Sequence, residues 1–112
     1  MKPALKAAFG GELAAAAAAR DYETAFYHLA RAHILSQRYT AAHVRVHWRM
    51  LRSALAAGDL GEAVGQAIRI AAAAAFSRIW VPLGNTGRAD VSALRPMPVP
   101  EDLRALLEAD DR

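Results

Sequence analysis

The sequence predicts an all-α fold: two antiparallel helix pairs over residues 3–76, an extended C-terminal strap over 77–99 and a short helix over 100–109. Three observations support this prediction. Apolar residues recur at the three-and-four spacing of amphipathic helices through most of the first 76 residues. Asp and Gly stand where these helices would begin and end. Four of the five prolines follow residue 76 and interrupt the helical period there.

The length and composition of the chain exclude several classes of protein. A chain of 112 residues is expected to form one domain, 1–112. Cysteine is absent, which excludes disulfides, thiolate metal sites and a cysteine nucleophile. The apolar amino-terminal stretch is interrupted at residues 10–12 by Gly-Gly-Glu, so it does not resemble a secretory signal. No run of about 20 apolar residues occurs, and we expect a cytoplasmic protein.

The first pair comprises helices over residues 3–19 and from Asp21 to about Gln37. Pro3 suits a first helical turn, while the Gly10-Gly11 pair predicts local fraying or a kink. Asp21 is a natural N-cap, and Glu23 complements the helix dipole. The apolar positions of the second helix predict one buried face: Tyr22, Ala25, Phe26, Leu29, Ala32 and Leu35.

The second pair comprises helices from Tyr39 or Thr40 to about Ala57 and from Asp59 to Phe76. Gly58 between them can adopt the left-handed conformation that ends a helix. The apolar spacing of the third helix predicts that its buried stripe is Val44, Trp48, Leu51 and Leu55. The corresponding inward face of the fourth helix is Leu60, Ala63, Val64, Ala67, Ile68 and Ala71.

An internal repeat links the two pairs. RDYETA at 20–25 and GDLGEA at 58–63 align Asp21 with Asp59 at a period of 38 residues. In both copies the motif follows one helix and begins the next, as in stacked helix pairs. The pattern resembles tetratricopeptide-like (TPR-like) repeats, in which a Gly-Asp-hydrophobic-x-x-Ala turn separates paired helices. The resemblance covers about residues 3–76 and implies two TPR-like units.

The segment after residue 76 has a different character. SRIWVPLGNTGRADVSALRPMPVP holds no helical period, and its apolar side chains predict a strap laid over the helices. The alternative is that GNTG at 84–87 forms a ligand-binding loop through its backbone amides. Pro100, Glu101 and Asp102 then begin the last helix.

Nearly the whole chain also resembles a bacterial family of short helical proteins that has no assigned activity. The resemblance rests on HLARAHILSQ at 28–37, HVRVHWRML at 43–51, GQAIR at 65–69 and a tail with VPLGNTGRADVS and PMPVPEDL at 81–103. Such proteins look like neighbours of metal-resistance genes in some bacteria. The resemblance therefore implies a metal hypothesis.

All four histidines lie in the second and third helices. His43 and His47 are four residues apart and project from one helix face. If the turn is centred near residue 38, His33 faces His43 and His28 lies near His47. We therefore predict His33, His43 and His47 as a candidate ligand set, with His28 or Met50 completing it.

Three or four imidazole nitrogens suit Zn²⁺, Cu²⁺ or Ni²⁺, and a thioether ligand would favour Cu⁺. Glu23 and Glu62 are candidates for outer carboxylates. The alternatives are that these histidines are helix residues hydrogen-bonded to backbone or tyrosine, or that they sense pH.

A row of arginines is the second candidate site. Arg38, Arg45, Arg49 and Arg52 are spaced as one ridge on the third helix and could hold the carboxylates of a protein or acidic peptide. The ridge is short, and the acidic carboxyl end of the chain competes for it, which argues against nucleic acid. No serine lies in a nucleophile motif and no carboxylate pair is placed for acid and base work, so we expect no enzyme.

The sequence thus favours a non-enzymatic adaptor or scaffold with Arg45, Arg49 and Arg52 as contact points. The alternative is a metal-binding or metal-resistance accessory protein using the histidines. Because two repeats are few for a free-standing array, we also expect that the chain could form a homodimer by stacking helical layers.

Overall fold

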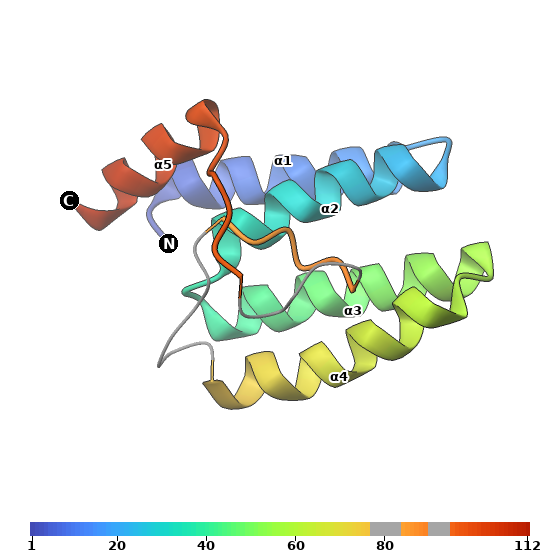
Figure 1. Cartoon of the computed structure of the whole chain (residues 1–112). Coiled ribbons are helices and arrows are strands. Elements are labelled where there is room, and N and C mark those ends of the chain that lie inside the picture. The colour runs from blue at the N-terminus through green and yellow to red at the C-terminus, as the bar shows by residue number, and fades with distance from the viewer. Residues whose placement is uncertain (77–83, 90–94) are drawn as a thin grey trace.

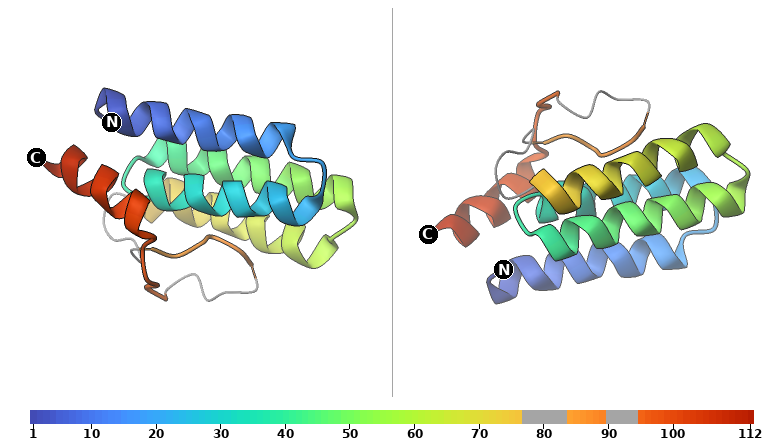
Figure 2. Two further views of the ribbon diagram at one scale, coloured as in Figure 1. Left: turned by 90° about the horizontal axis from the view of Figure 1, so that it is seen from above. Right: turned by 90° about the horizontal axis from the view of Figure 1, so that it is seen from below.

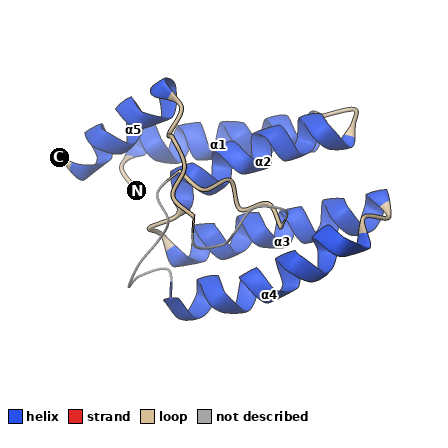
Figure 3. Ribbon diagram, viewed as in Figure 1, coloured by secondary structure: helices blue, strands red, loops and turns tan. Residues whose placement is uncertain are grey.

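The computed structural model describes residues 1–76, 84–89 and 95–112, and these ranges contain helices and no strand. The helices are α1 (Pro3–Ala18), α2 (Tyr22–Ser36), α3 (Thr40–Ala57), α4 (Leu60–Phe76) and α5 (Glu101–Asp111). The predicted all-α class is confirmed (Figure 3). The predicted strap falls partly on residues 77–83 and 90–94, which lie outside the described residues, while 84–88 and 95–100 contain neither helix nor strand.

The first four helices form a row in which each packs against the next in the sequence (Figures 1 and 2). α1 and α2 make one antiparallel pair, and α3 and α4 make the other. α5 returns to the amino-terminal end and contacts α1 and α2. Residues 84–89 run across the front of the row between α2 and α4 (Figure 1).

The helix boundaries follow the local chemistry of the sequence. The Asp21 carboxylate accepts the backbone N–H of Thr24 at 2.7 Å, and the Asp59 carboxylate accepts that of Glu62 at 3.1 Å. Each bond satisfies an amide that the first helical turn leaves without a partner. Gly58 ends α3 with a φ of 74°, in the left-handed region. α1, in contrast, continues through the Gly10-Gly11 pair.

The main core lies between α1, α2 and α3. Its fully buried members include Leu5, Phe26, Leu29, Val46 and Met50. α5 adds Leu103, which is 1% exposed. Apolar burial of this kind contributes roughly 25 cal/mol per Å² and holds the three-helix centre together.

Two predicted buried faces are partly wrong. Trp48 and Leu55 of α3 are 53% and 55% exposed, and the buried face of α3 is instead His43, Val46, His47, Met50 and Ala54. On α4, Ala63 is buried as predicted, but Leu60, Val64 and Ile68 are more than 60% exposed. His47 contacts both His43 of α3 and Gln66 of α4, and because these polar contacts lie inside, the other faces of α3 and α4 lie outside.

The acidic carboxyl end pairs with the basic centre of the chain. Arg31 contacts both Glu12 of α1 and Asp102 of α5, and Arg38 donates to Asp111 at 2.8 Å. The backbone N–H of Lys2 donates to Asp110 at 2.6 Å. These contacts hold α5 against α1 and α2. They also pair part of the basic charge in the centre of the chain with carboxylates of its acidic end. No helix in the described part of the chain has the length and apolar character needed to cross a membrane.

Candidate metal centre

Three histidines from two helices converge at one buried point. His33 comes from α2, and His43 and His47 come from successive turns of α3. Their Nε2 atoms form a triangle: 2.9 Å from His43 to His33, 3.1 Å from His47 to His43 and 3.1 Å from His33 to His47. All three side chains are buried, at 3% to 6% exposure.

The other ring nitrogen of two of these histidines faces an oxygen atom. His33 Nδ1 lies 2.7 Å from the carbonyl oxygen of Asn85, and His47 Nδ1 lies 2.6 Å from Oε1 of Gln66. An oxygen acceptor requires the proton to be on Nδ1. In the neutral rings, Nε2 of His33 and of His47 therefore presents a lone pair to the centre of the triangle.

The triangle thus holds more lone pairs than protons. His43 can place its proton on Nε2 and donate it towards one neighbour, which leaves the other neighbour's lone pair without a donor. Its own Nδ1 is buried and has no hydrogen-bond partner among the described residues. Buried polar atoms are usually paired, so such a deficit of donors at three converging nitrogens indicates a place for a cation.

Burial keeps these rings neutral. It lowers the pKa of His43 and of His47 from 6.5 to about 4, and the neighbouring histidine adds to the shift for His43. The pKa of His33 is lowered well below 6.5, first by burial and then by His47 and His43. A neutral imidazole is the form that can ligate a metal, so burial holds the three rings in the protonation state that a metal site requires.

Gln66 of α4 orients His47. Its Oε1 accepts from His47, while its Nε2 donates to Glu62 at 2.7 Å and to the carbonyl of Gly87 at 2.8 Å. Glu62 also accepts the backbone N–H of Ala89 at 2.8 Å. The amide of Gln66 is 0% exposed and satisfied on both its oxygen and its nitrogen, so it fixes the ring of His47.

The GNTG stretch, residues 84–87, lies directly against the cluster. Its Asn85 carbonyl orients His33, and Gly87 is so close to the His33 ring that an added Cβ would stand 2.5 Å from Cδ2 and 2.8 Å from Nε2. The amides of Gly84 and Gly87 donate to side-chain oxygens of Gln37 and Asn85. These two amides therefore bond within the chain, which favours the strap over the alternative that GNTG holds a ligand through its backbone amides.

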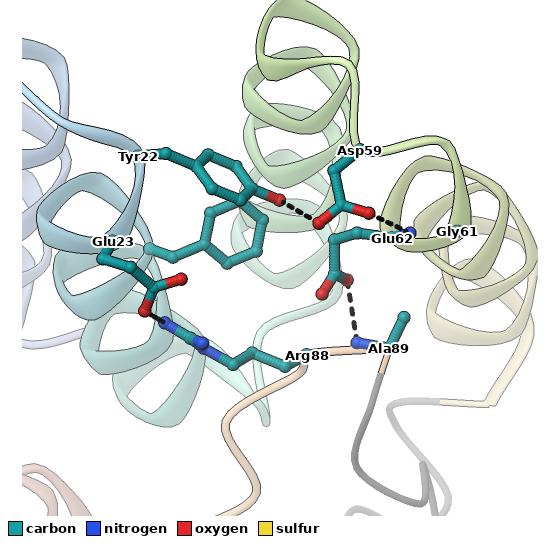
Figure 4. Close-up of a pocket in the computed structure, with 8 residues that line it drawn as sticks. Tyr22, Glu23, Asp59, Gly61, Glu62, Arg88 and Ala89 are labelled. Carbon is teal, nitrogen blue, oxygen red and sulfur yellow. Dashed lines mark hydrogen bonds and ion pairs between the residues drawn. The ribbon is translucent and has the colours of Figure 1, made fainter.

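A cleft of about 370 Å³ lies between the start of α2, the start of α4 and residues 88–89 (Figure 4). Tyr22 donates to Asp59 across it at 3.1 Å, and Arg88 pairs with Glu23 at 3.3 Å. Glu62 lines the same cleft and contacts Gln66 on its other side. Hydrogen bonds from His47 through Gln66 to Glu62 therefore connect the buried triangle with this cleft.

The structure brings together three of the four predicted histidine ligands. His28 lies apart, with its Nδ1 2.8 Å from Glu12 of α1. Met50 is fully buried in the apolar core one turn beyond His47. Of the two predicted outer carboxylates, Glu62 reaches the cluster through Gln66, and Glu23 pairs with Arg88 instead. The sequence did not assign these roles to Asn85, Gln66 and Gly87, although GQAIR and GNTG belong to the stretches that carry the family resemblance.

The predicted arginine ridge is divided. Arg38 lies outside α3, which begins at Thr40, and its guanidinium pairs with Asp111. Arg45 and Arg52 are exposed on α3, and Arg49 is half-buried. The described residues offer no ion pair to Arg45 or Arg52. The exposed part of the ridge is therefore Arg45 and Arg52, with Trp48 between them.

Comparison with known proteins places the chain in a family. A family model described as a protein of unknown function (DUF3703) matches residues 3–107, and the chain belongs to this family. Neither the curated proteins nor the solved structures gave a significant match. The chemistry of the histidine cluster therefore carries the functional argument.

Proposed function

We propose that this protein binds a divalent transition-metal ion through Nε2 of His33, His43 and His47. One observation carries the proposal: three buried Nε2 atoms lie 2.9–3.1 Å from one another, while oxygen atoms hold the outer nitrogens of two of the rings. This is the arrangement by which proteins fix imidazole ligands, with the second nitrogen donating to an oxygen atom.

The size of the triangle fits a metal ion. With metal–nitrogen bonds of about 2.0–2.1 Å, two nitrogens of a tetrahedral site lie about 3.3 Å apart and two adjacent nitrogens of an octahedral site about 2.9 Å apart. The observed edges of 2.9–3.1 Å fall near this range. Three protein nitrogens would leave at least one coordination position of a four- or six-coordinate ion for water or another ligand.

The ligand chemistry selects the class of metal. Three neutral imidazoles suit Zn²⁺, Cu²⁺ and Ni²⁺, and no carboxylate joins the three histidines among the described residues. The burial of all three histidines and the close approach of Gly87 to His33 favour binding or sensing over turnover, because they leave the site little access for a substrate. We therefore place the protein with metal-binding or metal-resistance accessory proteins and expect no enzymatic activity.

Metal should stabilise the chelator-stripped protein. At a free concentration 100 times its dissociation constant, a ligand of the native state adds about 2.7 kcal/mol, which for a domain of this size raises the melting temperature by roughly 10 °C. We expect this shift for Zn²⁺, Ni²⁺ or Cu²⁺, measured by thermal unfolding. His43→Gln should abolish it, because the amide can donate to the neighbouring nitrogens but provides no imidazole ligand.

His28→Gln is the matched control, since it changes the same residue type on α2 outside the triangle. It should keep the full response to metal. Circular dichroism should show that both variants fold. A wild-type protein that does not shift with any of the three metals, or a His43→Gln variant that shifts as the wild type does, contradicts the proposal.

A second candidate function, that of an adaptor, rests on the exposed face of α3. Arg45, Trp48 and Arg52 stand on one side of the helix, and Trp48 is 53% exposed. Arginine and tryptophan are the residue types that dominate binding energy at protein interfaces. This face suits an acidic peptide of a partner protein, as the sequence predicted for the arginine ridge.

The test of the adaptor function is a comparison of proteins captured from a bacterial lysate by the wild type and by Arg45→Glu/Arg52→Glu. We expect a partner that the wild type retains and the charge-reversed variant loses, with no change in the metal response. Retention of the same partners by both proteins would show that this face is not the docking site.

A further inference from the structure

The outer surface of α4 is apolar, although it faces solvent. The three large side chains Leu60, Val64 and Ile68 are 68%, 62% and 66% exposed. Spaced four residues apart, they form one stripe along the helix. Every exposed residue of α4 with a described side chain is Leu, Val, Ile, Ala or Gly, and the charged residues Glu62 and Arg69 are half-buried on the other side.

The internal repeat shows what such a face does. At the repeat period of 38 residues, Leu60 corresponds to Tyr22, Val64 to Phe26 and Ile68 to Ala30. In the first unit this face is covered: Phe26 is 1% exposed and Ala30 is 8% exposed. Tyr22 reaches Asp59 at the start of α4, and the Arg88 guanidinium lies 5.4 Å from the Phe26 ring.

The second unit has no third unit to cover the same face. Among the described helices α4 packs only against α3, and it ends the row (Figures 1 and 2). Terminal units of helical arrays ordinarily carry a polar outer face, because an apolar one would be exposed to water. This terminal helix instead repeats the apolar positions of an internal one.

We propose that the outer face of α4 is a homodimer interface, covered by the same face of a second copy of this chain. The absence of charge argues for self-association, since an acidic or basic partner would find no complementary charge there. A two-fold pair of these faces brings no like charges together and lets small residues approach closely. Homodimer interfaces are also the more apolar class of protein interface.

Val64→Glu/Ile68→Glu tests the interface by placing two negative charges on each protomer. Sedimentation or light scattering should show a dimer for the wild type. In the variant, the dissociation constant of the dimer should rise by about 100-fold or more. The two-fold axis places the introduced charges of both protomers in the interface, where each would be desolvated. Ala14→Glu/Ala18→Glu places the same pair on exposed positions of α1 and should leave the dimer intact.

A disulfide experiment gives an independent test, because the chain contains no cysteine. Val64→Cys should oxidise to a covalent dimer, while Ala14→Cys should stay monomeric under the same conditions. A monomeric wild type, or a Val64→Glu/Ile68→Glu variant as dimeric as the wild type, overturns the proposal. Repeating the measurements with chelator and with Zn²⁺ separates this result from that of the metal site.

Discussion

The free energy of unfolding of the metal-free protein should fall steeply as the pH drops from 6.5 towards 4. The cause is the buried histidine triangle, in which the pKa values of His43 and His47 are lowered from 6.5 to about 4 and that of His33 is lowered as well. Each histidine that takes up a proton on unfolding contributes a slope of about 1.4 kcal/mol per pH unit.

The sign follows from which state binds more protons. Between pH 4 and pH 6.5 the unfolded chain protonates these histidines, while the folded chain keeps them neutral. Protons therefore favour the unfolded state, so the contribution of the triangle is complete above pH 6.5 and is lost as the pH approaches 4. The lowered pKa values of Asp21, Asp102 and Asp110 act in a different window, below the ordinary carboxylate value of 3.8.

Urea unfolding of chelator-stripped protein at several pH values between 4 and 7 measures this slope. His43→Gln removes one titrating ring and should reduce the slope by about the share of one histidine. An unfolding free energy that stays level across this range in the wild type would show that the three rings are not held neutral by the fold.

Much of the histidine triangle could be predicted from local spacing. The i,i+4 pair His43 and His47 follows from helical geometry, and His33 follows from the register of the hairpin between α2 and α3. The same register could not place His28, because five residues from His33 turn it to another side of α2, where it meets Glu12. That the triangle binds metal stays a prediction.

The contacts that hold the triangle depend on tertiary structure. Asn85 lies 52 residues from His33 and Gln66 lies 19 residues from His47. No periodicity brings a carbonyl of an irregular segment to a particular imidazole, so sequence spacing could not assign these partners. GNTG and GQAIR belong to the stretches that carry the family resemblance, but a resemblance does not indicate what these residues contact.

The helices were predicted with sound boundaries and partly wrong orientations. Asp21, Gly58 and Asp59 determine where helices begin and end through their own hydrogen bonds or φ angle, and these are local. Local sequence does not decide which side of α3 and of α4 is buried, because both helices are apolar on more than one side. Hydrophobic spacing selected Trp48 and Val64 as inward residues, whereas the polar contacts of His47 and Gln66 decided the orientation.

Gly87→Ala should disrupt the metal site, because the added methyl group would meet the ring of His33 directly. The added Cβ would lie 2.5 Å from Cδ2 of His33, a separation that real contacts do not reach. Either His33 or the backbone at residue 87 must move. The carbonyl of Gly87 accepts from Gln66, which orients His47, so a backbone shift also disturbs a second histidine.

Gly58→Ala is the matched control for this substitution. Gly58 and Gly87 have φ angles of 74° and 79°, so alanine meets the same left-handed backbone penalty of about 1–2 kcal/mol at either position. No atom lies within 4 Å of a Cβ added at Gly58. Any loss that Gly87→Ala shows beyond that of Gly58→Ala therefore reports the contact with His33.

Competition for Zn²⁺ with a coloured chelator measures the affinity of both variants. We expect Gly58→Ala to bind as the wild type does and Gly87→Ala to bind about 100-fold more weakly, the upper range for changes in groups that orient metal ligands. Equal affinities of the two variants for Zn²⁺ would mean that the histidine triangle tolerates movement of the backbone at residue 87. A selective loss would show that GNTG acts on the metal without a ligand atom of its own, by fixing His33 directly and His47 through Gln66.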